Sequence, residues 1–472
     1  MSTLARPSPA AAHPLPTLAA LREQFPALCA SSSNRTIFLD NAGGSQLPAC
    51  VPAAMLRHMT ERYVQLNADY TLSQQATATV RIAHEFAKVF VNAVDHAGSA
   101  AQGKGPGEVI LGPSSTALCH IMAEAYARAH MQGKLPQPQR TEIIVCTAGH
   151  EANVGPWLRL QERGFTIREW PAERDLADGV WRPRISTLAS MLTDRTRLVT
   201  FPQVSNILGE VLDVAAITRL VHDAGARVVV DGVAYAPHHA PDVQAWGCDW
   251  YVWSWYKVFG PHMAGMYGSR DAFAEITGPN HDFLPRDMIP YLFELGGVNH
   301  ESCAGLVGLQ EYLGFAAGVT DVTDVTDLTE VEDAGQVAGH AAERTRQTSL
   351  IPRAAVAQAF HHMHALEHQA LRVLIAGLEA RNDVTFYGPG YADAPAGSPA
   401  RVATVAFTLA GRKSADVARA LNAKNIGVRF GNFYSLRLCE QMSLDPKDGV
   451  VRASLAHYTT PAEIERLLAA IG

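Results

Sequence analysis

Residues 250–261 read Trp-Tyr-Val-Trp-Ser-Trp-Tyr-Lys-Val-Phe-Gly-Pro. The aromatic run is typical of a buried strand, and the closing Gly-Pro predicts a turn directly after it. This strand would deliver Lys257 to its own carboxyl end. Upstream, residues 227–232 read Arg-Val-Val-Val-Asp-Gly, which predicts a second buried strand that ends at Asp231.

Ligands of open α/β sheets bind beyond the carboxyl ends of the strands, where we expect Lys257 and Asp231 to meet. Such a pair is what an enzyme needs in order to use pyridoxal 5'-phosphate (PLP). The lysine amine forms a Schiff base with the PLP aldehyde, and the carboxylate keeps the pyridine nitrogen protonated. The simpler alternatives are a solvated loop lysine and an aspartate that caps a helix, so this pair alone does not decide the function.

The bulk composition indicates a cytoplasmic, globular enzyme. A chain of 472 residues exceeds one small core, and 47% hydrophobic with 18% charged residues suits a large interior. The net charge of −7, without a long basic block, argues against a nucleic acid or an anionic membrane as partner. No apolar run approaches the roughly twenty residues of a membrane span. The seven scattered cysteines include no CxxC pair, which is typical of reduced thiols.

Strands and helices are predicted to alternate between about residues 108 and 270. Apolar runs at 108–111, 142–145, 197–201 and 227–230 are separated by helical patterns such as 117–130 and 214–224. Nearly all-apolar strands alternating with helices predict a parallel sheet that is covered on both faces. Before this region we expect helices over 16–30, 47–66 and 76–94 and a short strand over 36–40.

Three parts of the chain are expected. Residues 1–15 are Pro- and Ala-rich and predict a flexible arm, and residues 16–350 would form a large domain whose N-terminal segment packs near the smaller one. Residues 351–472 would begin with a connecting helix over 354–381 and continue as a small α+β domain, with alternation at 401–407 and helices at 414–424 and from Pro461. The acidic segment 320–334 is predicted to be an inserted surface element.

Several short motifs accompany the lysine and the aspartate, each placed after a predicted strand or in a turn. They are Gly112-Pro-Ser-Ser-Thr116, Gly149-His-Glu-Ala-Asn153, Val204-Ser-Asn-Ile-Leu-Gly209, Gly297-Val-Asn-His-Glu301 and Val451-Arg-Ala-Ser-Leu-Ala-His-Tyr-Thr-Thr460. Taken singly they are a helix cap, a structural histidine, two turns and a salt-bridging arginine. Their order along one chain is far more specific than any single match.

In this order the sequence resembles the class V aminotransferase group of fold-type I PLP enzymes, and within it the cysteine desulfurase/selenocysteine lyase-like branch. The resemblance covers roughly residues 36–310 and 400–472. It implies an α/β fold, with a mixed, mostly parallel sheet and helices on both faces in the large domain and a smaller α+β C-terminal domain. It also implies PLP as cofactor, a small amino-acid substrate and a homodimer.

The resemblance assigns the cofactor contacts. Ser114, Ser115 and Thr116 would hold the PLP phosphate, because free N–H groups and the positive end of a helix attract an anion. Further contacts are implied for Ser254 and Tyr256 at the phosphate, His150 on the pyridine ring, Asn206 near the phenolic oxygen, and Asn299, whose loop would reach the neighbouring subunit's phosphate.

On the substrate side, the resemblance implies that Arg452 grips the α-carboxylate, which a planar guanidinium does in two-pronged fashion. A surface salt bridge is the alternative for this residue. Asn41, Asn153 and Arg429 are expected on the same side of the site. Phe430 and Phe433 hint at a pocket for a bulky side chain.

Two departures from the branch bear on the reaction. Desulfurases of this branch carry a sulfur-accepting cysteine in a loop that corresponds to residues 428–434, where this chain has Tyr434. A phenol cannot form a persulfide, which argues against the usual sulfur transfer, and Cys439 lies five residues further on as the one nearby thiol. The branch's cofactor-binding glutamine is replaced by Ala234.

We therefore expect a PLP-dependent lyase that cleaves a C–S bond at Cβ, with Lys257, Asp231, His150 and Tyr434 as catalytic residues. A class V aminotransferase or epimerase remains open because it would use the same Cα carbanion, and a non-catalytic scaffold is a third alternative. No metal site is expected: His361, His364 and His368 share a helix face, but a solvated polar stripe explains them. The Gly-rich segment 102–107 is interpreted as an ordinary loop.

Overall fold

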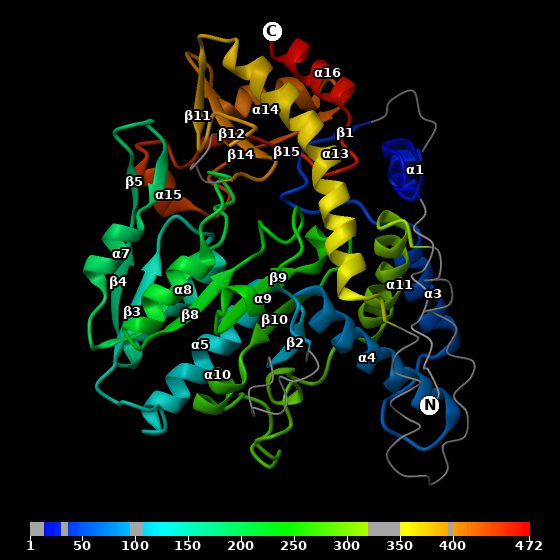
Figure 1. The fold of residues 1–472 in the computed structure, drawn as a ribbon, viewed down its shortest axis with the longest axis vertical. Helices are drawn as coiled ribbons and strands as arrows, with labels where there is room; N and C mark the ends of the chain where they lie inside the picture. The colour runs from blue at the N-terminus through cyan, green and yellow to red at the C-terminus, as the bar shows by residue number, and fades with distance from the viewer. Residues whose placement is uncertain (1–13, 30–35, 95–106, 320–349, 395–399) are drawn as a thin grey trace, which may run out of the picture.

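A seven-stranded sheet forms the centre of the molecule in this computed structural model, which describes residues 14–29, 36–94, 107–319, 350–394 and 400–472. The strands lie in the order β2 (Glu108–Gly112), β10 (Ala264–Gly268), β9 (Trp250–Ser254), β8 (Arg227–Asp231), β7 (Thr196–Pro202), β3 (Glu142–Cys146) and β4 (Thr166–Trp170) (Figure 1). Strand β10 runs antiparallel to both of its neighbours, and β9 to β4 are parallel. The predicted mixed, mostly parallel sheet is confirmed.

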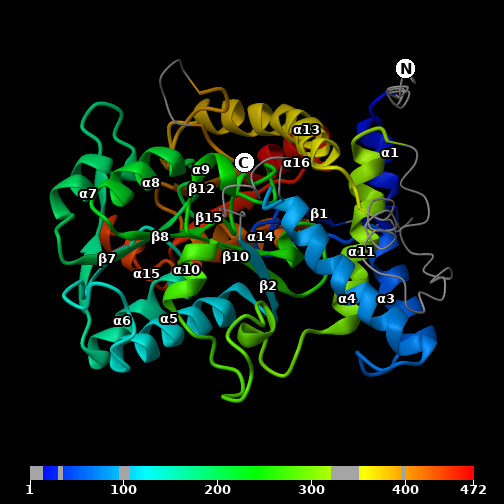
Figure 2. The ribbon, with the colours of Figure 1, turned by 60° about the horizontal axis from the view of Figure 1, so that its bottom comes forward.

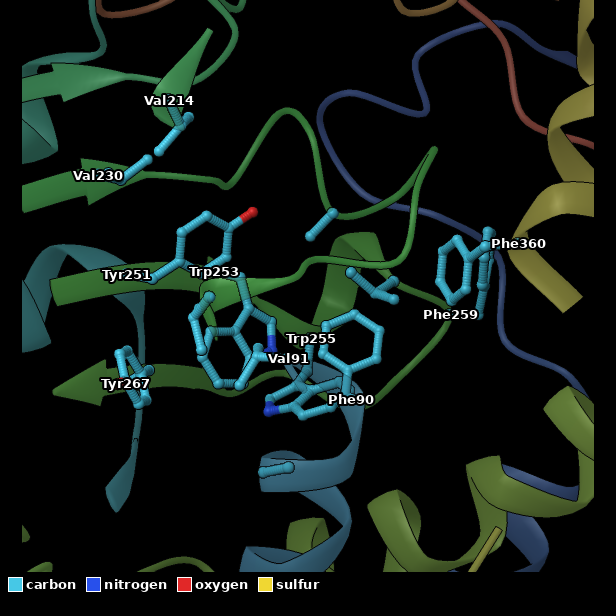
Figure 3. Packing of buried hydrophobic residues seen from close by; sticks show 14 of the residues in the cluster. Phe90, Val91, Val214, Val230, Tyr251, Trp253, Trp255, Phe259, Tyr267 and Phe360 are labelled. Carbon is cyan, nitrogen blue, oxygen red and sulfur yellow. The ribbon is translucent and has the colours of Figure 1, made fainter. Parts of the chain in front are cut away.

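The aromatic run of residues 250–255 forms strand β9 and the first residue after it, and its side chains alternate between the two faces of the sheet. Tyr251, Trp253 and Trp255 pack with Phe90 into one core cluster (Figure 3), whereas Trp250 belongs to the cluster on the opposite face. Both faces of the strand are therefore buried, as its run of large apolar and aromatic residues predicts.

Helices cover the sheet on both sides (Figure 2). The first core cluster takes residues from α4 (Thr71–Phe90), α8 (Val214–Asp223), α11 (His300–Ala316) and the start of α13 (Arg353–Glu379), with α3 (Cys50–Glu61) packed on α11. The second takes residues from α5 (Ser115–Met131), α6 (Gly155–Leu158) and α10 (Arg270–Glu275). This arrangement leaves the carboxyl edge of the parallel strands to be covered by other parts of the chain.

A smaller antiparallel sheet lies beyond that edge, at the top of Figure 1. Its strands lie in the order β11 (Val384–Tyr387), β12 (Thr404–Leu409), β15 (Val450–Ser454) and β14 (Arg429–Gly431), and α14 (Ser414–Asn422) and α16 (Pro461–Ile471) accompany it. The N-terminal strand β1 (Ile37–Phe38) pairs with β13 (Ile426–Gly427) beside it. Helix α13 belongs to the large core through Ala355–Met363 and to the core of the small sheet through Ala370–Leu378.

Some elements differ from the sequence expectations. The helix expected over 16–30 is broken into α1 (Leu18–Glu23) and α2 (Pro26–Cys29), since Pro26 begins a new helix more readily than it continues one. Helix α4 begins five residues earlier than residue 76, and the strand expected from residue 401 begins at Thr404. The hairpin of β5 (Ala172–Arg174) and β6 (Trp181–Pro183) was not anticipated.

Residues 1–13 of the expected arm, the acidic segment 320–334 and residues 102–106 of the Gly-rich loop lie outside the described residues. The division of the chain near residue 350 stays a prediction. Among the helices that the structure describes, none is long and apolar enough to cross a membrane.

Candidate active site

A cavity of about 50 Å³ lies where five strands of the central sheet end. The residues that line it follow β2, β3, β7, β8 and β9: Ser115, Thr116, His150, Ala152, Pro202, Val204, Asn206, Asp231, Val233, Ala234, Tyr256 and Lys257. The sequence places these residues far apart, and the shared direction of the strands brings them to one edge.

Asp231 and Lys257 lie on neighbouring strands of this edge. Asp231 ends β8, which pairs in parallel with β9, and Lys257 lies in the single turn that follows β9. The residue after Asp231 must be small, because a Cβ on Gly232 would lie 2.0 Å from the ring of Tyr251. The predicted meeting of the lysine and the aspartate at one cavity is found.

Burial shifts the pKa values of both groups toward their neutral forms. It raises the pKa of Asp231 to about 6, although the carboxylate accepts a hydrogen bond from the N–H of Val233 at 3.0 Å. It lowers the pKa of Lys257 to about 8, and the nearby charge of Arg452 acts in the same direction. Among the described residues, no group hydrogen-bonds to the Nζ of Lys257, which lies 5.9 Å from the ring centre of Tyr256.

The start of helix α5 forms one end of the cavity. Ser115 and Thr116 are its first residues and line the cavity, and the Ser254 hydroxyl hydrogen-bonds to the Ser115 hydroxyl at 3.2 Å. The unpaired N–H groups of a 17-residue helix at this end favour an anion. Ser114 instead caps the helix, accepting from the N–H of Ala117 at 3.1 Å, and its side chain does not line the cavity.

His150 lies at the cavity with its ring held by the backbone. Its Nδ1 accepts a hydrogen bond from the N–H of Ala152 at 3.0 Å. Burial lowers the pKa of His150 to about 4, and the positive charges of Lys257 and Arg452 add to this effect. The imidazole is therefore neutral at pH 7.

Tyr434 covers His150, with 5.2 Å between the ring centres, although 67% of the tyrosine is exposed. Its loop is fixed at several points: Asn206 donates to the carbonyl of Phe433 at 2.9 Å, and the N–H of Glu151 donates to the carbonyl of Tyr434 at 2.8 Å. Phe433 and Tyr434 have φ angles of 50° and 60°, a region that side-chain-bearing residues seldom adopt. Such strain persists only where the surroundings hold it, and it concentrates at functional sites.

Arg452 lies on β15 of the small sheet and is 3% exposed. It donates to the carbonyl of Asn206 and to the carboxylate of Asp40, each at 3.3 Å, and its Nε has no partner among the described residues. The guanidinium lies 3.8 Å from the ring centre of Phe433. Burial lowers the pKa of Arg452 to about 10, so it stays charged at neutral pH.

Asp40 also pairs with Arg429 at 3.6 Å, so that one carboxylate faces two arginines. Neither Asp40 nor the contact between Arg452 and Phe433 was predicted from the sequence. The signal for Asp40 was its place at the end of a short strand, directly before Asn41.

Three further predicted site residues lie away from this cavity. The Asn41 amide donates to the carbonyls of Phe38 and Ser454 and accepts from the Tyr458 hydroxyl, so its side chain joins β1 to β15. The Asn153 carbonyl accepts from the indole of Trp157 at 3.3 Å in the core. Asn299 is exposed and caps α11, accepting from the N–H of Ser302 at 2.7 Å.

None of the seven cysteines lines the cavity, and all seven are unpaired. Cys439, the thiol nearest to Tyr434 in the sequence, is fully buried, and burial raises its pKa to about 11. A buried, protonated thiol is a poor nucleophile. Among the described residues, no three His, Cys, Asp or Glu side chains are placed to hold a metal ion.

Comparison with known proteins decides the family. The model of the family Aminotransferase class-V matches residues 37–280 and 354–467. The chain belongs to the class V aminotransferase family. Members of this family are PLP-dependent enzymes, and this chain is one of them.

Relatives of this family member cover nearly its whole length. The "Aminotransferase-like protein FGM3" of Gibberella zeae is 33% identical over 96% of both chains. A cysteine desulfurase of Klebsiella pneumoniae is 28% identical over 96% of both. The crystal structure of the cysteine desulfurase CsdA from Escherichia coli has the same fold, with a TM-score of 0.72 at 21% identity, covering 97% of this chain and 98% of that one.

The cavity of this class V aminotransferase family member has the polar groups that PLP requires. A helix start suits the phosphate, a buried carboxylate suits a protonated ring nitrogen, and the Lys257 amine has no hydrogen-bond partner among the described residues. The residues present therefore fit the cofactor.

Proposed function

We propose that this enzyme cleaves the C–S bond of a cysteine-like amino acid by β-elimination. One observation carries the proposal. Lys257 and Asp231 line one cavity, and Arg452 donates to the carbonyl of Asn206, which lines the same cavity. None of the seven cysteines lines it. Proton removal at Cα is thus supported, whereas sulfur transfer to an enzyme thiol is not.

The residues that would hold PLP are those at the strand ends. Lys257 would bond to the aldehyde, Asp231 would pair with the ring nitrogen, and His150 would lie on the ring face. Ser115, Thr116, Ser254 and Tyr256 would surround the phosphate, and Asn206 would lie near the phenolic oxygen. When bound, PLP supplies an electron sink that makes the Cα–H bond of the amino acid acidic.

Arg452 would fix the substrate carboxylate. Its guanidinium already holds the Asp40 carboxylate at 3.3 Å, and a substrate carboxylate would compete for the same donors. Phe433 covers one face of the guanidinium and so limits the approach to its edge.

Lys257 would take the Cα proton as its neutral amine. A pKa of about 8 leaves part of the amine neutral near pH 7.5, so proton transfer needs little further shift. The electron pair of the breaking Cβ–S bond would leave with the thiolate, and the exposed hydroxyl of Tyr434 would give it a proton. With L-cysteine and water the products would be pyruvate, ammonia and hydrogen sulfide.

Transamination is a second candidate, because a relative named "Aminotransferase-like protein FGM3" is 33% identical over 96% of the chain. Epimerisation would use the same proton transfer. We further propose that the protein acts as a cytoplasmic homodimer: its cysteines are unpaired, and the apolar side chains of Leu56, Met59 and Tyr63 are exposed in the last turns of α3 and just after it.

Product analysis with L-cysteine tests the proposal. Pyruvate with ammonia supports elimination, alanine with sulfur would mean desulfuration, and a keto acid formed only with an acceptor would mean transamination. Lys257→Ala should abolish every product, while Lys134→Ala, at an exposed surface lysine, should behave as wild type. The absence of any product from L-cysteine and from its S-conjugates would overturn the proposal.

A further inference from the structure

A second, smaller cavity lies on the other side of Lys257. It has a volume of about 10 Å³, and Asn41, Ser45, His238, Phe259 and Glu367 line it together with Lys257. The first cavity is the one whose donors fit the cofactor. Lys257 lines both cavities, so the second cavity stays beside this lysine when the cofactor occupies the first.

His238 and Glu367 form a buried pair in this second cavity. Nδ1 of His238 lies 2.8 and 2.9 Å from the two carboxylate oxygens of Glu367, and the side chains are 5% and 4% exposed. Because a carboxylate only accepts, Nδ1 carries the proton. The other ring nitrogen, Nε2, has no hydrogen-bond partner among the described residues.

The two residues come from separate parts of the fold. His238 follows β8 by a short turn, and Glu367 lies midway along α13 between the two sheets. Removing two ionisable groups from water costs several kcal/mol each, so a pair of this kind is not explained by stability alone. An imidazole held by a carboxylate is instead suited to take and release a proton.

We propose that His238 and Glu367 form a proton relay for Lys257. This inference rests on the proposed function, in which Lys257 takes the Cα proton and must later release it. The volume of the second cavity is roughly that of one water molecule, with Lys257, His238 and Ser45 as polar partners. The Lys257 ammonium gives a proton to the water, the water gives one to Nε2, and the Glu367 carboxylate stabilises the imidazolium.

Other charges face this relay and enter its pH dependence. His239, His364, His457 and Tyr458 surround the pair, and Asp231, Asp40, Arg452 and Arg429 surround Lys257. His361 is the matched control, because it is an exposed histidine on the same helix α13 and lines neither cavity.

Two measurements on the holoenzyme test the relay. The first is the exchange of the Cα hydrogen of L-alanine with D2O by NMR, which needs no leaving group on Cβ. The second is the rate at which the visible cofactor band responds to a pH jump in the presence of 2-aminoisobutyrate, which has no Cα hydrogen. Both rates should fall about tenfold or more in His238→Gln and Glu367→Gln, and stay within about twofold in His361→Gln.

Cofactor content should be equal in all variants, which separates a lost relay from a damaged site. Wild-type rates in His238→Gln would overturn the inference. If the glutamine variants fail to fold, the exchange rate of the wild type is measured in mixtures of H2O and D2O. A curved dependence of this rate on the D2O fraction indicates that several protons are in transfer, and a straight line overturns the relay. Failure of the proposed function can be distinguished from failure of the relay, because Lys257→Ala would then keep both the visible cofactor band and the exchange of the Cα hydrogen.

Discussion

The ring of Tyr434 lies 5.2 Å from the ring of His150, tilted by 42°. His150 follows β3 of the central sheet and Tyr434 follows β14 of the small one, so this contact joins the two sheets over the cavity. By resemblance, the branch places its sulfur-accepting cysteine where Tyr434 stands. The contact therefore marks the position at which this enzyme should differ most from a desulfurase.

Replacing Tyr434 by phenylalanine removes the proposed acid and keeps the ring on His150. We expect Tyr434→Phe to lower kcat on L-cysteine by about a hundredfold, the usual contribution of general acid catalysis, and to leave KM unchanged. Tyr70→Phe, at an exposed tyrosine that lines neither cavity, is the control. An unchanged kcat would remove Tyr434 from the mechanism.

A cysteine at the same position should restore the missing sulfur acceptor. The backbone of the loop is held by Asn206 and Glu151, so Tyr434→Cys should leave its course intact. We expect the variant to form a persulfide with L-cysteine, detected as a mass increase of one sulfur atom, and to release alanine. Persistent formation of pyruvate alone would show that the outcome does not depend on this residue.

Arg452→Lys should weaken substrate binding. A lysine keeps the charge and loses the planar pair of donors, which costs about 2 kcal/mol, or roughly a thirtyfold rise in KM. Arg429→Lys, whose guanidinium is 57% exposed, should change KM by less than about threefold. Equal effects of the two substitutions would show that Arg452 is not the main carboxylate contact.

Asp231→Asn should change the pH dependence of stability in the cofactor-free protein. The folded pKa of about 6 lies above the ordinary aspartate pKa of 3.8, so Asp231 contributes stability that is present below pH 3.8 and is lost as the pH rises through 6. The asparagine variant lacks this loss. Its free energy of unfolding in urea, relative to wild type, should therefore rise by about 1 to 1.5 kcal/mol between pH 5 and pH 8. A difference that falls with pH would contradict the assigned burial.

The residues of the cavity that follow strands could be predicted because the ends of buried strands can be recognised in the sequence. The runs Val228–Val230 before Asp231 and Trp250–Trp253 before Lys257 consist of apolar and aromatic residues, which is typical of a sheet buried on both faces. Parallel pairing then requires their last residues to meet. The same reasoning placed His150 at the carboxyl edge, whereas Asn206 was assigned through the family resemblance; both line the cavity.

Contacts between segments far apart in the chain could not be predicted from the sequence. The stacking of Phe433 on Arg452 and the position of His238 beside Glu367 depend on how the small sheet and α13 pack, which no local pattern encodes. The sequence did not reveal that the amide of Asn41, a residue expected at the substrate, joins two strands, because local polarity does not show which partner a buried amide finds.

The covalent attachment of PLP can be measured directly. The purified protein is reduced with borohydride, digested, and mapped by mass spectrometry for the peptide that carries the reduced cofactor. The account predicts that the modified residue is Lys257 and that Lys257→Ala carries no adduct. An adduct on another lysine, or none in a protein that shows the visible cofactor band, would contradict it.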